Sequence, residues 1–103
     1  MDIKEKLIEK LKKWIIETDV ITLDKDVPVE CDEKSTRELR DGSSKEVYKL
    51  SFRTEDVIRY DEKGEIGQFG EGMYCSAYYD AEKLELLYIA KGKPGYIEPD
   101  GSY

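Results

Sequence analysis

The side chains best suited to chemistry in this chain are two cysteines and a large set of carboxylates. Histidine, the usual general base and the commonest metal ligand, is absent. Two cysteines cannot complete a structural zinc site, and a catalytic thiol needs a neighbouring base or cation to lower its pKa. We therefore expect Cys31 and Cys75 to be free thiols, with a disulfide between them as the less favoured alternative. Cys75 lies in an apolar strand pattern and is expected in the core.

Several motifs resemble known sites but lack essential residues. Residues 66–72 contain three glycines but no following Lys, Ser or Thr, and Glu65 and Glu71 would repel a phosphate. The run Asp24-Lys25-Asp26 begins like a calcium-binding loop, but Val29 stands where that loop needs glycine. The 24 acids are too numerous for any pair to stand out as an acid and base for glycoside hydrolysis. We predict that the protein is not an enzyme and holds no metal and no cofactor.

The charge of the chain is acidic and unevenly distributed. The net charge is −7, and residues 54–103 contribute −6 of it. Such a surface repels nucleic acids and anionic lipids and attracts basic proteins. No apolar run approaches the roughly 18 residues of a membrane span, and the N-terminus lacks the apolar stretch of a signal peptide. We expect a cytoplasmic protein that contacts neither nucleic acid nor membrane.

All eight tyrosines lie at position 48 or later, so that most of them fall in this acidic part of the chain. Tyrosine supplies a large contact area at a low entropy cost and is enriched at protein interfaces. Tyrosine is also a good strand former, so some of these residues are expected to belong to the sheet itself. The eight tyrosines are Tyr48, Tyr60, Tyr74, Tyr78, Tyr79, Tyr88, Tyr96 and Tyr103.

The N-terminal segment predicts an amphipathic helix over residues 2–17. Asp2 and Glu5 have the spacing of a capping box. The apolar residues lie within an arc of about 140° and would face a core. They are Ile3, Leu7, Ile8, Leu11, Trp14 and Ile15.

The strongest strand signals lie in three segments. Residues 46–53 alternate, with Tyr48, Leu50 and Phe52 on one face. Residues 73–79 and 84–90 predict a hairpin with a four-residue loop, so that Tyr79 would pair with Leu84. One face of this hairpin is assigned to the core: Met73, Cys75, Ala77, Tyr79, Leu84, Leu86, Tyr88 and Ala90. The other face is too apolar for ordinary surface: Tyr74, Ser76, Tyr78, Glu85, Leu87 and Ile89.

The remaining segments are less regular. Residues 27–29 contain a proline and predict an edge strand or a turn. Residues 32–45 hold many charges and predict an exposed loop, in which Arg37 and Arg40 are weaker candidates for gripping a carboxylate or phosphate. Residues 54–60 predict a strand or a single helical turn, and residues 92–103 a tail that either folds back or stays loose.

These segments predict an α+β fold and a binding function. We expect one domain over residues 1–103, with the helix packed on one face of a four- to five-stranded antiparallel sheet spanning residues 19–91. A barrel of strands plugged by the helix is the alternative. The function predicted is capture of a basic protein, as by an inhibitor, an immunity protein or an antitoxin. A homodimer or homo-oligomer without catalysis, and a small-ligand-binding domain, are the alternatives. The predicted partner face consists of Tyr74, Tyr78, Glu85, Leu87 and Ile89.

Overall fold

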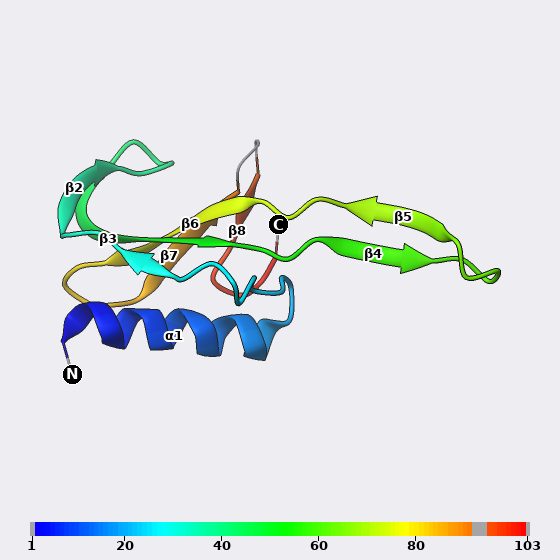
Figure 1. Ribbon diagram of the computed structural model, residues 1–103. Coiled ribbons are helices and arrows are strands. Elements are labelled where there is room, and N and C mark those ends of the chain that lie inside the picture. Colours follow the sequence, from blue (N-terminus) through cyan, green and yellow to red (C-terminus); the bar gives the residue numbers. More distant parts are fainter. Residues whose placement is uncertain (1, 92–94, 103) are drawn as a thin grey trace.

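In a computed structural model, the chain folds into one long helix packed beneath an antiparallel sheet (Figure 1). The structure describes residues 2–91 and 95–102, and for residues 57–60, 66, 68 and 69 it describes the backbone alone. Helix α1 spans Ile3–Thr18. The carboxylate of Asp2 accepts a hydrogen bond from the backbone N–H of Glu5 at 2.8 Å, as the capping pattern predicts. The α+β prediction is confirmed.

The main sheet has six strands in the described part of the chain. Its path runs β1-β3-β6-β7-β8, and β2 pairs with the same edge of β3 as β1 does. All pairings in this sheet are antiparallel. The strands are β1 (Glu30–Cys31), β2 (Ser35–Glu38), β3 (Ser44–Arg53), β6 (Tyr74–Asp80), β7 (Leu86–Ala90) and β8 (Tyr96–Ile97).

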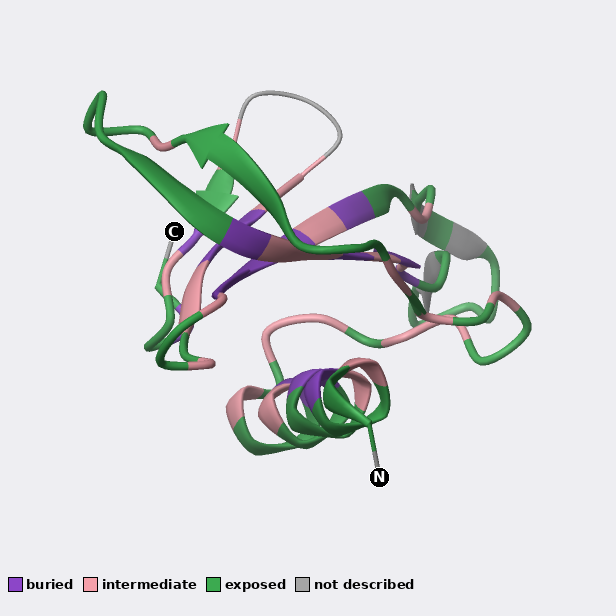
Figure 2. Cartoon of the chain, turned by 90° about the vertical axis from the view of Figure 1, so that its left-hand side faces the viewer, coloured by how far each residue is buried: buried purple, intermediate pink, exposed green. Residues whose placement is uncertain are grey.

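The main core lies between α1 and the sheet. Leu7 and Leu11 of the helix are fully buried against the sheet, and Ile15 is nearly so. The view along the helix in Figure 2 shows its buried stripe turned toward the strands. On the strand side this core holds Leu50, Phe52, Cys75, Ala77, Tyr79, Ile89 and Ile97. The alternation that predicted which sides of β3 and β6 face the core is therefore confirmed. Met73, expected in the core, is 41% exposed.

A second hairpin projects from the sheet. Strands β4 (Val57–Tyr60) and β5 (Ile66–Gly70) pair only with each other, and the ribbon points away from the body (Figure 1). The strand alternative for residues 54–60 is thus the correct one. The projection raises the radius of gyration to 15.2 Å, compared with the roughly 13 Å expected for a compact chain of this length.

The prediction that residues 32–45 form a loop is wrong. Ser35–Glu38 form β2, which pairs with residues 44–47 of β3. A strand that is exposed on both faces carries no apolar alternation, so periodicity misses it. The tail, in contrast, folds back: Tyr96 and Ile97 pair with β7, and Ile97 is 1% exposed.

The predicted register of β7 is also wrong. Tyr79 pairs with Leu86 and Tyr78 with Tyr88, so Leu87 is an extra residue in a bulge. The bulge moves every later side chain to the opposite face. Ile89, predicted on the partner face, is therefore fully buried under the helix, whereas Tyr88 and Ala90, predicted in the core, lie on the other side of the sheet.

Candidate functional site

The sheet face opposite the helix carries arginines stacked on tyrosines. The guanidinium carbon of Arg37 lies 4.3 Å from the ring centre of Tyr78, and that of Arg40 lies 4.4 Å from the ring centre of Tyr96. The rings of Tyr78 and Tyr88 are 5.0 Å apart, and those of Tyr88 and Tyr96 5.5 Å apart. These distances suit cation–π and tilted aromatic contacts. We call these five residues the arginine–tyrosine face.

This face is rich in positive charge. Lys45 and Lys49 of β3 project on the same side as Val47, which packs against Tyr78. Lys45 pairs with Asp80 at 3.3 Å, and Arg40 pairs with Glu98 at 2.7 Å. Within the described residues, neither Arg37 nor Lys49 forms an ion pair. The face therefore keeps cations free for an anionic partner.

The predicted partner residues do not form one exposed surface. Tyr78 is 3% exposed because Arg37 and Leu39 cover it, and Ile89 lies in the main core. Tyr74, at the other end of β6, is 67% exposed. Glu85 is exposed in the β6–β7 connection, and Leu87 is partly buried in the bulge. The structure does bring Arg37 and Arg40 to the tyrosines, a contact that sequence reasoning missed because it treated their segment as a loop.

The acids concentrate instead on the projecting hairpin. Residues 55–72, which we call the acidic arm, contain six acids and two bases, a net charge of −4. The remaining 85 residues carry only −3. The turn residues 61–65 are all exposed, as are Glu55 and Glu71. Among the described residues, the single arm acid in an ion pair is Asp56.

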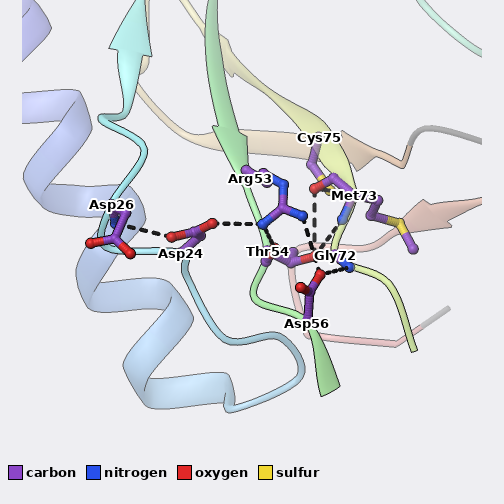
Figure 3. Close-up of polar contacts among 8 residues, drawn as sticks. All are labelled: Asp24, Asp26, Arg53, Thr54, Asp56, Gly72, Met73 and Cys75. Atoms are coloured by element: carbon purple, nitrogen blue, oxygen red, sulfur yellow. Dashed lines mark hydrogen bonds and ion pairs between the residues drawn. The ribbon is translucent and has the colours of Figure 1, made fainter. Parts of the chain in front are cut away.

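A polar network fixes the base of the arm to the body (Figure 3). The guanidinium of Arg53 donates to Asp24 at 2.6 Å and to Asp56 at 3.1 Å. Asp24 precedes the sheet and Asp56 belongs to the arm, so a single cation joins the two. The hydrogen bonds to Arg53, above all that of Asp24, raise its pKa further, which keeps it charged at all physiological pH values.

The second strand of the arm is held at the same point. The backbone N–H of Gly72 donates to Asp56 at 2.7 Å, and this bond together with Arg53 lowers the pKa of the Asp56 carboxyl. The backbone N–H of Thr54 donates to the carbonyl oxygen of Met73 at 2.9 Å, and the backbone N–H of Met73 donates to the hydroxyl oxygen of Thr54 at 3.0 Å. A side chain at position 72 would place its Cβ 2.1 Å from the Thr54 carbonyl oxygen, so only glycine fits. These contacts set the direction in which the arm leaves the sheet.

An apolar groove lies on the helix side of the sheet, beside the C-terminal half of α1. Its volume is about 490 Å³. Ile16 stands at its wall and is 79% exposed, and Lys12 and Lys25 also line it. The aliphatic lining consists of Ile15, Ile16, Ile21, Leu23, Val27 and Val29.

Two buried side chains with titratable protons, Cys75 and Tyr79, are held in their protonated forms. Burial raises the pKa of the Cys75 thiol to about 11 and that of the Tyr79 hydroxyl to about 12. Both groups are therefore protonated and weakly nucleophilic near neutral pH. Both cysteines are free thiols. Within the described residues, no three Cys, Asp or Glu side chains gather in a group that could hold a metal ion.

The chain was compared with protein families, with curated proteins and with solved structures. No protein-family model, no curated protein and no solved structure matches the chain. No helix within residues 2–91 and 95–102 is long and apolar enough to cross a membrane.

Proposed function

We propose that the protein is a non-catalytic binding module that captures a basic protein through its acidic arm. The observation that carries this proposal is the arm itself: a two-stranded ribbon that projects from the body and holds more than half of the net charge in 18 of 103 residues. An isolated two-stranded hairpin is marginally stable alone. Its projection therefore suits a role in which a partner completes its packing.

Electrostatics supports the same conclusion. Some acids of the body are paired with bases, for example Asp80 with Lys45 and Glu98 with Arg40. The exposed carboxylates of Glu62, Glu65 and Glu71 have no such base among the described residues. Unpaired charges of one sign steer a partner of the opposite sign and set its orientation. The arm thus takes the role that the sequence assigned to the tyrosine-bearing face.

The test neutralises three of the six arm acids and keeps Asp61, whose carboxylate closes the turn. The arm variant carries Glu62→Gln, Glu65→Gln and Glu71→Gln. A control variant carries Glu9→Gln, Glu17→Gln and Asp26→Asn, which neutralise three exposed carboxylates of the body. Wild type and both variants are used as bait in lysate of the cells that produce the protein, and the captured protein is then purified for affinity measurement.

A basic protein that binds the wild type and the control equally, and the arm variant about tenfold or more weakly, would support the proposal. Its affinity for the wild type should also fall as salt rises. Equal binding to all three proteins, or a captured partner that is itself acidic, would contradict it.

The apolar groove supports a second candidate function, the binding of an amphipathic small ligand. A medium-chain fatty acid could lay its chain along the aliphatic lining and its carboxylate near Lys12 or Lys25. Such an acid should raise the melting temperature of the wild type but not that of an Ile16→Asp variant. Because Ile16 is 79% exposed, this substitution should leave the fold intact. Equal melting shifts in both proteins would exclude the groove.

A further inference from the structure

The acidic arm and the unpaired cations of the arginine–tyrosine face lie toward different ends of the molecule. Strand β3 runs about 30 Å from Ser44 to Arg53 at the usual rise per residue. Arg37 pairs in register with Lys45 near the start of β3, and Lys49 lies midway. The acidic arm begins just after the last residue of β3 and continues away from it (Figure 1). The positive and negative surfaces are therefore separated along the 52 Å length of the molecule.

The two surfaces cannot neutralise each other within one chain. The network of Arg53, Asp24 and Asp56 directs the arm away from the body, and its turn at residues 61–65 is fully exposed. Among the described residues, the rings of the arginine–tyrosine face are covered by its own arginines and by Leu39, Leu87 and Ala90, and the two arginines are themselves exposed. Both surfaces are open to a second molecule.

We propose that the acidic arm of one copy docks on the arginine–tyrosine face of a second copy, in a head-to-tail contact. This inference rests on the proposed function in one respect, that the arm is the binding element. The carboxylates of the arm would meet Arg37 and Lys49, which have no acid partner among the described residues. Tyr96, which is 45% exposed, adds apolar contact area beside these charges.

The charge pattern favours a second copy over an unrelated acidic protein as the occupant. The same chain supplies both halves of a complementary pair, and a contact between two different patches of identical molecules is heterologous. Such a contact leaves one arm and one face free at the two ends of a dimer, so it continues into a ring or a short chain. It also occupies the arm, so a basic partner and a second copy compete for the same carboxylates.

Two complementary variants test this arrangement. The arm variant described above keeps an intact arginine–tyrosine face. A face variant with Arg37→Gln and Lys49→Gln keeps an intact arm. Lys49→Gln alone serves as a second face variant because the Lys49 side chain forms no hydrogen bond or ion pair among the described residues. Sedimentation velocity is measured on each protein across micromolar to millimolar concentrations. Circular dichroism checks that each variant is folded.

We expect the wild type and the body control to associate with rising concentration, and each variant alone to stay a monomer. An equal mixture of the arm and face variants should form a dimer and nothing larger, because each contributes the half that the other lacks. The apparent Kd of self-association should rise at least about tenfold in either variant. A face variant should still bind the basic partner.

Three results would overturn the inference: a wild type that is monomeric at every concentration, a mixture that stays monomeric, or an arm variant that associates like the wild type. None of them depends on capture of a basic protein. If the wild type is monomeric but the arm still captures a partner, the head-to-tail contact is wrong and the proposed function stands. If the copies associate through the arm but no basic partner depends on it, the proposed function is wrong and the head-to-tail contact stands.

Discussion

Two hairpins of this chain have similar turns, but one packs on the body and the other projects from it. In the β2–β3 hairpin, the carboxylate of Asp41 accepts the backbone N–H of Ser43 at 2.9 Å, and Gly42 has φ +86°. In the β4–β5 hairpin, Asp61 accepts the N–H of Lys63 at 2.9 Å, and Gly64 has φ +81°. Both use an Asp side chain to close the turn and a glycine in the left-handed region. Yet the first curls over the sheet and the second projects from it (Figure 1).

The difference lies in what each hairpin can cover. The β2–β3 hairpin supplies Arg37 and Leu39, which close over Tyr78, and its own Val47 is 1% exposed. The turn of the arm offers only charged residues and a glycine at positions 61–65. Local turn chemistry therefore creates both hairpins, and the β2–β3 hairpin docks on the body through the packing of Arg37, Leu39 and Val47 against Tyr78.

Removing the ring that the β2–β3 hairpin covers should have the largest effect on stability. Tyr78→Ala should lower the free energy of unfolding by about 3–5 kcal/mol, the scale for deleting a buried aromatic side chain. Tyr74→Ala, on the same strand and face but 67% exposed, should lower it by less than about 1 kcal/mol. Urea unfolding of both variants measures the contrast. Similar losses at the two positions would show that the hairpin does not protect Tyr78.

The base of the arm should be the next most sensitive point. Gly72→Ala would force a Cβ against the Thr54 carbonyl oxygen and the Arg53 guanidinium, and should cost about 1–3 kcal/mol. Gly70→Ala, which lies outside this junction, is the comparison. The measurement is the urea midpoint together with the amide chemical shifts of Thr54 and Met73. Unchanged shifts in Gly72→Ala would mean that the junction does not set the direction of the arm.

The sequence predicts those parts of the fold whose pattern is local. The helix is found to within one residue at each end, because its apolar period and the Asp2 cap are both local. The core-facing sides of β3 and β6 are also predicted, since uninterrupted strands alternate strictly. The register of β7 is not predicted correctly, because it depends on the conformation of the connection after Asp80. There Leu84 adopts φ +58° and Leu87 bulges, neither of which apolar alternation reveals.

The candidate site was only partly predictable for a related reason. The acidity of the C-terminal half and its tyrosines are visible in composition, but their separation onto different surfaces depends on β2. The Asp41-Gly42 pair, flanked by two strand-length polar segments, is the signal that could have revealed that hairpin. Once β2 is placed, Arg37 must lie opposite Lys45 and near Tyr78, and the tyrosine face becomes basic.

Weakening the cation–π contact should loosen the docked hairpin without unfolding the protein. Arg37→Ala should lower the free energy of unfolding by about 0.5–1 kcal/mol and raise the accessibility of Tyr78 to solvent. Arg37→Lys should recover part of that loss, because an ammonium also binds a ring face. Solvent-perturbation absorbance of tyrosine and urea unfolding report the two effects. No change in tyrosine accessibility would show that Arg37 does not cover the ring.

Acid should weaken the body through Asp80. Hydrogen bonds from the backbone N–H groups of Lys83 and Glu82, with Lys45 nearby, lower the pKa of this carboxyl. A carboxyl whose pKa is lowered by folding stabilises the protein above its unfolded value of about 4, and that stability is lost as pH falls through the folded value. The urea midpoint should therefore drop between pH 6 and pH 3. Asp80→Asn should shrink this drop, and an unchanged pH dependence would contradict the assignment.

A matched pair of glycine substitutions separates the two hairpins most sharply. Gly42 and Gly64 both have positive φ, and a Cβ at either would meet no atom within 4 Å, so alanine adds only backbone strain of about 1 kcal/mol. Gly42→Ala strains a docked hairpin and should lower the global free energy of unfolding by that amount. Gly64→Ala should leave global stability unchanged, because the arm can open without the body, and should speed amide exchange at the arm turn about fivefold. Equal global losses in both variants would mean that the arm folds cooperatively with the sheet rather than as an independent ribbon.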